Sequence, residues 1–182
     1  MKASLPGHSG PSGGFKVLEM LSACHRRIEQ QCSTLRRLVP HLAAHGNDDE
    51  ARAAAASVIR YFETAAKVHH ADEEEDLFPA LMESMAGSDA VCLRELTQGL
   101  VGEHRELETR WQHLRAALEA IAANAAASLS AAEVETFVAR YEHHIRLEER
   151  ELLPMAARLL SDAELDRIGR AMCERRWVRL DL

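Results

Sequence analysis

The chain has 182 residues, enough for one domain with a buried core, and 47% of them are hydrophobic while only 4% are aromatic. Many Ala and Leu residues with only 5 Pro favour packed helices over a β-sandwich, so we predict an all-α fold. The formal net charge of −7 argues against nucleic-acid binding, and no stretch has the roughly 20 consecutive apolar residues of a membrane span.

The compartment is predicted from the cysteines and the N-terminus. The 4 cysteines show no Cys-x-x-Cys spacing and no dense framework, which favours a reducing compartment. The N-terminal residues lack the apolar region of a signal peptide. We therefore expect a cytoplasmic protein without a membrane partner.

The first helix is expected from about Phe15 to His45, after a disordered lead-in over residues 1–14 that is rich in Gly, Ser and Pro. Apolar residues recur every three or four positions along it, which is the pattern of a helix facing the core of a bundle. His25 occupies one of these inward positions. Pro40 should loosen the last turn of the helix, and Gly46 should end it.

The second helix is expected to open with a capping box made by Asn47 and Glu50. Pro79 should kink or stop this helix, and residues 87–88 should turn the chain. A third helix follows over about 89–124, and a single histidine again interrupts its apolar seam.

Two further capping boxes place the last helices. Ser130 with Glu133 opens a fourth helix, and Ser161 with Glu164 opens a short fifth one that ends near residues 175–176. The expected organisation is a lead-in, a bundle, and a C-terminal helix with its tail, over residues 1–14, 15–160 and 161–182.

Two segments of the chain repeat each other. The sequence HHADEEEDLFP at 69–79 returns as HIRLEERELLP at 144–154, and aligning the prolines superimposes a His-x-x-x-Glu pair in each. The sequence around His25 likewise matches that around His104. The chain therefore consists of two αα-hairpins, which we expect to close into an antiparallel up-down four-helix bundle with a short extra C-terminal helix.

Six side chains are expected to meet in one core layer. Residues four apart share a helix face, so each His-x-x-x-Glu pair directs an imidazole and a carboxylate inward, and an unpaired buried glutamate would cost several kcal/mol. Four imidazoles with two bridging carboxylates suit two iron ions joined by an oxide or hydroxide, with about one open position per ion; Zn or Mn could take their place in a purified sample. The predicted ligands are His25, His69, Glu73, His104, His144 and Glu148.

Four other side chains are weaker candidates. Glu29 and Glu108 each follow a predicted ligand histidine by four residues and could fill an open position, with surface ion pairs as the alternative. His70 lies about 100° away from the inward stripe and could bind metal or hydrogen-bond a ligand. Tyr141 could hydrogen-bond a bound oxygen species, with packing in the bundle as the alternative.

The sequence HHADEEEDLFPAL at 69–81 resembles the HHxxEExxLFPxL signature of hemerythrin-like (HHE cation-binding) domains. The resemblance covers about 15–160 and implies a four-helix bundle around a non-haem di-iron centre held by the six residues above. Oxygen-carrying hemerythrins have a histidine where this chain has Glu108, and an aspartate one position after Glu148, which argues against simple reversible O₂ carriage. The four-His, two-Glu set is more similar to that of RIC-type iron–sulfur cluster repair proteins, whose N-terminal cysteine motif is missing here.

These observations predict a di-iron protein that binds or senses O₂, NO, peroxide or iron, with a binding protein favoured over an enzyme. One alternative is a stress-repair factor that donates iron or metabolises NO or peroxide. The other is a metal-free helical module that acts through protein contacts.

Overall fold

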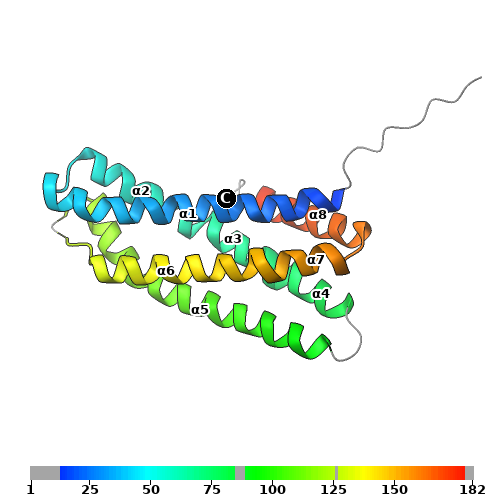
Figure 1. The fold of residues 1–182 in the computed structure, drawn as a ribbon. Helices are drawn as coiled ribbons and strands as arrows, with labels where there is room; N and C mark the ends of the chain where they lie inside the picture. The colour runs from blue at the N-terminus through cyan, green and yellow to red at the C-terminus, as the bar shows by residue number, and fades with distance from the viewer. Residues whose placement is uncertain (1–12, 85–88, 126, 179–182) are drawn as a thin grey trace, which may run out of the picture.

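The computed structural model describes residues 13–84, 89–125 and 127–178, which form helices and their connections with no strand among them (Figure 1). The expected lead-in and the turn at 87–88 lie outside these residues, except that the first helix already begins at Gly13. The prediction of an all-α fold is confirmed. Within the described residues, none of the helices combines the length and apolar character that crossing a bilayer requires.

The first helix, α1, spans Gly13–His45, as its apolar seam predicted. Gly46 ends it with a positive φ of 72°, a conformation that costs glycine little. Pro40 lies inside the helix, which continues past it to His45.

The second helix is divided into segments: α2 (Asp49–Glu63), α3 (Ala65–Asp72), a π-helical turn η1 (Glu73–Leu77) and α4 (Phe78–Ser84). The predicted capping box is wrong by one residue. Asp48 is the cap, and its carboxylate accepts a hydrogen bond from the Ala51 backbone nitrogen at 2.8 Å. The Asn47 side chain instead donates to the carbonyl of Ile121 at 3.0 Å, which ties the α1–α2 connection to another helix.

Each repeated segment contains a π-helical turn, which begins at its predicted ligand glutamate, Glu73 or Glu148. The backbone nitrogen after η1 bonds to the Glu73 carbonyl, and the one after η2 (Glu148–Leu152) bonds to the Glu148 carbonyl. Pro79 and Pro154 come next, within the first turn of the following helix, where a backbone donor is not required. The chain therefore stays helical after Pro79 as far as Ser84, so Pro79 does not stop the helix, which corrects one of the two expectations.

The second half of the chain follows the same plan. It contains α5 (Asp89–Ala122), α6 (Ala131–Leu147), η2, α7 (Leu153–Leu159) and α8 (Asp162–Val178). The caps predicted at Ser130 and Ser161 are confirmed, since each hydroxyl accepts a hydrogen bond from the backbone nitrogen three residues later. Helix α8 runs to Val178, slightly beyond the predicted end.

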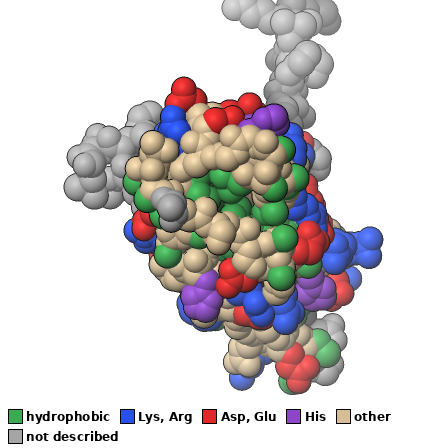
Figure 2. Space-filling view, turned by 90° about the vertical axis from the view of Figure 1, so that its left-hand side faces the viewer, with side chains coloured by type: hydrophobic (Ala, Val, Ile, Leu, Met, Phe, Trp, Pro, Cys, Tyr) green, Lys and Arg blue, Asp and Glu red, His purple; other side chains and the backbone are tan. Residues whose placement is uncertain are grey.

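The long helices lie side by side along one direction (Figure 1). Helix α1 packs against α2, α6 and α8, and α5 packs against α2 and α6. Their apolar faces form two separate clusters, an aromatic-rich one around Phe62 and Phe137 and an aliphatic one around Leu21 and Leu81. Figure 2 views the end of the molecule near the first cluster and shows hydrophobic side chains in the middle of that face. The predicted polar layer lies between the clusters, with Leu100 and Leu107 on either side of its α5 histidine.

Candidate metal centre

Six buried side chains converge between the two apolar clusters, and none is more than 1% exposed. Their donor atoms form two groups of four, in each of which all atoms lie within 4.8 Å of one another. Both groups contain Glu73 and Glu148; one adds His25 and His69, and the other adds His104 and His144. The structure thus brings together all six residues that the sequence singled out, as two four-donor sets that share both carboxylates.

Glu148 lies between histidines of different halves of the chain. His25 Nε2 is 3.0 Å from Glu148 Oε2, and His144 Nε2 is 3.0 Å from Glu148 Oε1. The two oxygens of one carboxylate therefore face different imidazoles. Two cations could each take one of these oxygens, which is the arrangement of a bridging carboxylate.

Glu73 is the residue of the first half of the chain that corresponds to Glu148 in the repeat. Its Oε1 lies 3.4 Å from His69 Nε2, and its Oε2 lies 3.5 Å from His104 Nε2. His69 and Glu73 face each other because they are one helical turn apart. Glu73 starts the π-helical turn η1, and such turns recur at functional sites because they re-aim a side chain within a helix.

Three of the four histidines are held from outside by carboxylates. His25 Nδ1 lies 2.6 Å from Glu149, and His104 Nδ1 lies 2.7 Å from Glu74. His144 Nδ1 lies 2.8 Å from Glu103. A carboxylate accepts hydrogen bonds, so these Nδ1 atoms donate and the Nε2 atoms are left facing the centre of the layer.

Glu74 follows Glu73 in a run of acidic residues, a pattern that usually marks a solvated helix face, yet its carboxylate lies 2.7 Å from His104 Nδ1. A signal was present, because Glu74 and Glu149 each follow a predicted ligand glutamate at the same place in the repeat. The pattern did not reveal that both side chains reach a histidine on a different helix.

The donor atoms at the centre require positive charge. All four oxygens of Glu73 and Glu148, together with Nε2 of His25 and both ring nitrogens of His69, are buried without a hydrogen-bond partner. The Nε2 atoms of His104 and His144 lie 3.0 Å apart, although each ring already donates its Nδ1 proton outward. Lone pairs and carboxylates that face one another in a dry core are stable only with protons or cations between them, so the six residues fit a pair of metal ions.

The pKa values of the histidines follow from the same geometry. Burial lowers the pKa of each ring, but the nearby carboxylates of Glu148 and Glu73 outweigh it and raise the pKa of His25 to about 11 and that of His104 to about 10. Burial also opposes the rise at His144, where Glu148 and Glu103 raise the pKa to about 9. His69 differs, since burial outweighs the attraction of Glu73 and lowers its pKa to about 4.

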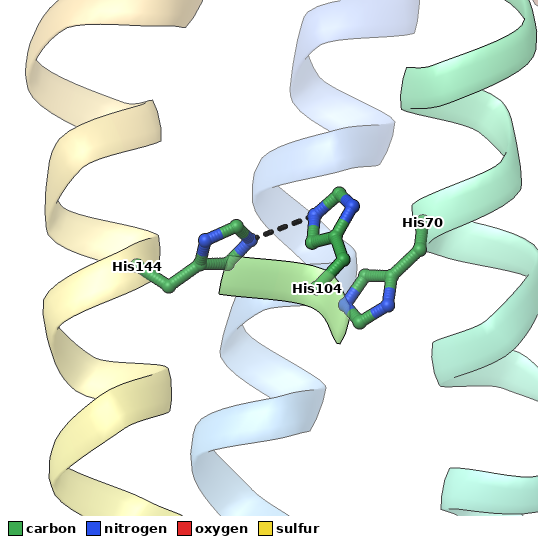
Figure 3. A group of neighbouring side chains, drawn as sticks. All are labelled: His70, His104 and His144. Atoms are coloured by element: carbon green, nitrogen blue, oxygen red, sulfur yellow. Dashed lines mark hydrogen bonds between the residues drawn. The ribbon is translucent and has the colours of Figure 1, made fainter. Parts of the chain in front are cut away.

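His70 lies beside the centre and not within it. Figure 3 shows its ring next to His104, which in turn faces His144, and the His70 and His104 rings stack with centroids 3.9 Å apart and planes at 10°. Nitrogens of these three rings come within 4.8 Å of one another. An ion in the plane of one stacked ring would lie well out of the plane of the other, so His70 and His104 cannot bind the same ion in this arrangement. The His70 ring therefore packs against the face of the ring of His104, a predicted metal ligand.

The remaining weaker candidates lie outside the layer. Glu29 is exposed on α1. Glu108 accepts a hydrogen bond from Gln112 at 2.6 Å, and its side chain is 45% exposed. Tyr141 is buried in the aromatic cluster, with its ring centroid 5.1 Å from that of Phe137. Glu108 also lies 3.9 Å from Lys67 Nζ, as in the alternative of a surface ion pair, and the Tyr141 ring packs in the bundle.

The chain is similar to a family model and to a protein of known sequence. The family model of the hemerythrin HHE cation-binding domain matches residues 16–156. A protein of Haemophilus influenzae, described as an uncharacterized protein, is 32% identical over 162 residues, which cover 89% of this chain and 91% of that protein. The matched span contains all six buried donors.

Proposed function

This chain belongs to the family of hemerythrin HHE cation-binding domains, and from that premise we propose that it binds two iron ions and binds or senses O₂, NO or peroxide at them. The predicted ligands are His25, His69, Glu73, His104, His144 and Glu148. The observation that carries the proposal is the pair of four-donor sets that share both carboxylates. We also propose that the long helices form the antiparallel up-down four-helix arrangement, which their pairwise packing supports.

Iron is favoured by the chemistry of the donors. Each set offers two imidazole nitrogens and two carboxylate oxygens, a mixture that suits iron better than an all-thiolate or all-oxygen set would. A bridging oxide or hydroxide would add a fifth ligand to each ion and leave about one position open. Zinc or manganese could fill the same donors in a purified sample. Bound iron would supply reversible electron transfer to a small molecule at an open position.

The protein around the centre restricts what can reach it. The donors are at most 1% exposed, and apolar clusters pack against the layer from both sides. A charged solute would lose its hydration on entering such a core, whereas a small diatomic molecule or peroxide would lose little. Outer carboxylates hold three of the imidazoles, and would keep these rings in a fixed orientation when a small molecule binds to or leaves the metal ions.

The deciding experiment pairs a metal-to-protein ratio with a visible spectrum of protein purified from iron-replete cells. We expect about two iron ions per chain and absorption from a bridged ferric pair; a colourless protein without metal would support the helical interaction module instead. Stopped-flow mixing of the diferrous form with O₂ or NO then separates the roles. A stable adduct supports binding or sensing, rapid catalytic decay supports an enzyme, and transfer of iron to an acceptor supports a repair factor.

A further inference from the structure

Helix α8 lies beyond the matched part of the chain, which ends at residue 156, and it packs along α1 (Figure 1). The two helices approach closely at Gly169. A Cβ atom built there would lie 2.8 Å from Val17 Cγ2, which is closer than such atoms can come. Val17 is only 3% exposed and has a stiff side chain, so the close approach depends on glycine. Gly169 therefore allows the middle of α8 to lie close to α1.

The last turns of α8 bind a buried carboxylate next to the metal centre. Arg175 Nη1 donates to Asp72 Oδ1 at 2.5 Å, and Arg176 Nη2 donates to Asp72 Oδ2 at 2.7 Å. The Asp72 side chain is fully buried and directly precedes Glu73, the first residue of η1. Two guanidinium groups on one buried carboxylate are a strong contact, and removing them would leave a buried charge without a partner.

The same turns of α8 also reach α1 beside another predicted ligand. Arg176 Nη2 lies 4.0 Å from the sulfur of Cys24, the residue that directly precedes His25. Helix α8 therefore touches the neighbours of two of the donors in the set formed by His25, His69, Glu73 and Glu148.

The other half of the repeat is built differently at these positions. Aligned by their histidines and glutamates, Cys24 corresponds to Glu103, and Asp72 corresponds to Leu147. Glu103 accepts a hydrogen bond from His144 Nδ1 at 2.8 Å, whereas His69 Nδ1 is buried without a partner. His69 is thus the predicted ligand whose Nδ1 no outer carboxylate holds, and it lies in α3, which packs against α8.

We propose that α8 is a clamp that retains the metal ion held by His25 and His69, and that the two metal positions are therefore inequivalent. The contact of Arg175 and Arg176 with Asp72 fixes the start of η1 and excludes water from the less supported ion. The ion held by His104 and His144 shares Glu73 and Glu148 with the first ion, but both of its histidines are held by outer carboxylates, Glu74 and Glu103, so it depends less on α8. This inference rests on the proposed binding of two ions.

The test is the rate at which each ion is lost. The full chain is loaded anaerobically with two equivalents of Fe²⁺ and mixed with an excess of a coloured ferrous chelator. In the variant Arg175→Gln/Arg176→Gln, one of the two ions should leave roughly tenfold faster or more, which is the lower end of the effect of outer contacts on metal affinity. The second ion, whose histidines are both held by outer carboxylates, should leave at a rate much closer to that of the wild type. Arg167→Gln/Arg170→Gln is the matched control, because it removes the same charge from exposed positions of α8.

A second pair of variants opens the clamp without touching Asp72 or its arginines. Gly169→Ala should push α8 away from Val17 and accelerate loss of the same ion, and Gly169→Ala/Val17→Ala should restore the space and the slow rate. Amide hydrogen exchange over α8 reports in each variant whether the helix has loosened. These variants decide the question if the double arginine variant does not fold.

The outcomes distinguish a failure of the α8 clamp from a failure of the proposed two-ion binding. A wild-type chain that does not take up two ions would overturn the proposed function. If it binds two, loss of both ions at equal rates in the arginine variant would overturn the clamp. Faster exchange in α8 of Gly169→Ala with no faster loss of either ion would overturn it as well.

Discussion

Glu74 accepts a hydrogen bond from Nδ1 of His104 at 2.7 Å, although the two residues are 30 positions apart and lie on different helices. The bond fixes which nitrogen of His104 carries the proton and which faces the centre. Glu74 also binds the side chain of Arg105 at 2.5 Å, so its own position is held from outside. A residue that looked like part of a solvated acidic run thus prepares a predicted ligand for metal.

The bridging carboxylates are the first test of the centre. Glu73→Gln/Glu148→Gln should lower the iron content from about two ions per chain to nearly none, because neutral amides cannot balance two cations in a buried site. The protein should still fold, since the change also removes two buried charges. Metal analysis and circular dichroism check both statements. Glu83→Gln/Glu151→Gln, at two exposed positions, is the control with the same charge change. A Glu73→Gln/Glu148→Gln variant that keeps two irons would disprove the assignment.

The outer carboxylate of His104 should affect metal affinity without binding metal. Glu74→Ala removes the acceptor from Nδ1, so the ring loses its fixed orientation and we expect roughly 10- to 100-fold weaker binding. A competition titration against a chelator of known affinity measures the change. Glu151→Ala, at an exposed position in η2, should leave the affinity unchanged. Equal affinities in both variants would show that the outer bond has no such role.

Metal loading should release protons. In metal-free protein at pH 7, His25 should carry protons on both nitrogens, because its pKa is about 11. The Nε2 atoms of His104 and His144 are 3.0 Å apart and should share a proton, because the pKa values of these residues are about 10 and 9. His69, with a pKa of about 4, is already neutral. Metal must displace the protons held by these Nε2 atoms, so affinity should rise between about pH 6 and about pH 9. Calorimetry in buffers of different ionisation enthalpy counts the protons, and binding without proton release would contradict this picture.

The same pKa values predict how metal-free protein responds to alkali. A histidine whose folded-state pKa is raised stabilises the fold fully below its unfolded value near 6.5, and that contribution is lost as the pH rises through the folded value. For His144, His104 and His25 the loss should begin near pH 6.5 and be complete near pH 9, 10 and 11, respectively. The Tm of metal-free protein should therefore fall over this range more than that of metal-loaded protein. An equal fall in Tm with rising pH in the metal-free and metal-loaded forms would refute the expectation.

The cap of α2 offers a test away from the centre. Asp48→Ala should lower the free energy of unfolding by about 1 kcal/mol, because the Ala51 backbone nitrogen loses its acceptor. Glu50→Ala, at the exposed position assigned to a capping box by sequence, should change it by less than about 0.5 kcal/mol. Urea unfolding of the two variants measures the difference, and a larger effect at Glu50 would reverse the assignment of the cap.

The helices and the inward face of each one followed from sequence, because apolar periodicity is a property of a single helix. It separated His69, which is fully buried in the layer, from His70, which stacks outside it. The internal repeat then predicted that the glutamates four residues after His69 and His144 would share one layer. The one-residue error at Asn47 had a local cause, since Asp48 next to it is an equally good cap.

Tertiary structure decided the contacts between helices. Glu149 reaches His25 across 124 residues, and Arg176 reaches Asp72 across 104, both from positions that look solvent-facing by periodicity. Whether such a side chain meets water or a partner depends on the relative height and rotation of two packed helices, which no pattern within one helix contains. The inward donors were therefore readable from the chain, whereas the carboxylates that orient them and the helix that covers them became visible only once the helices were packed.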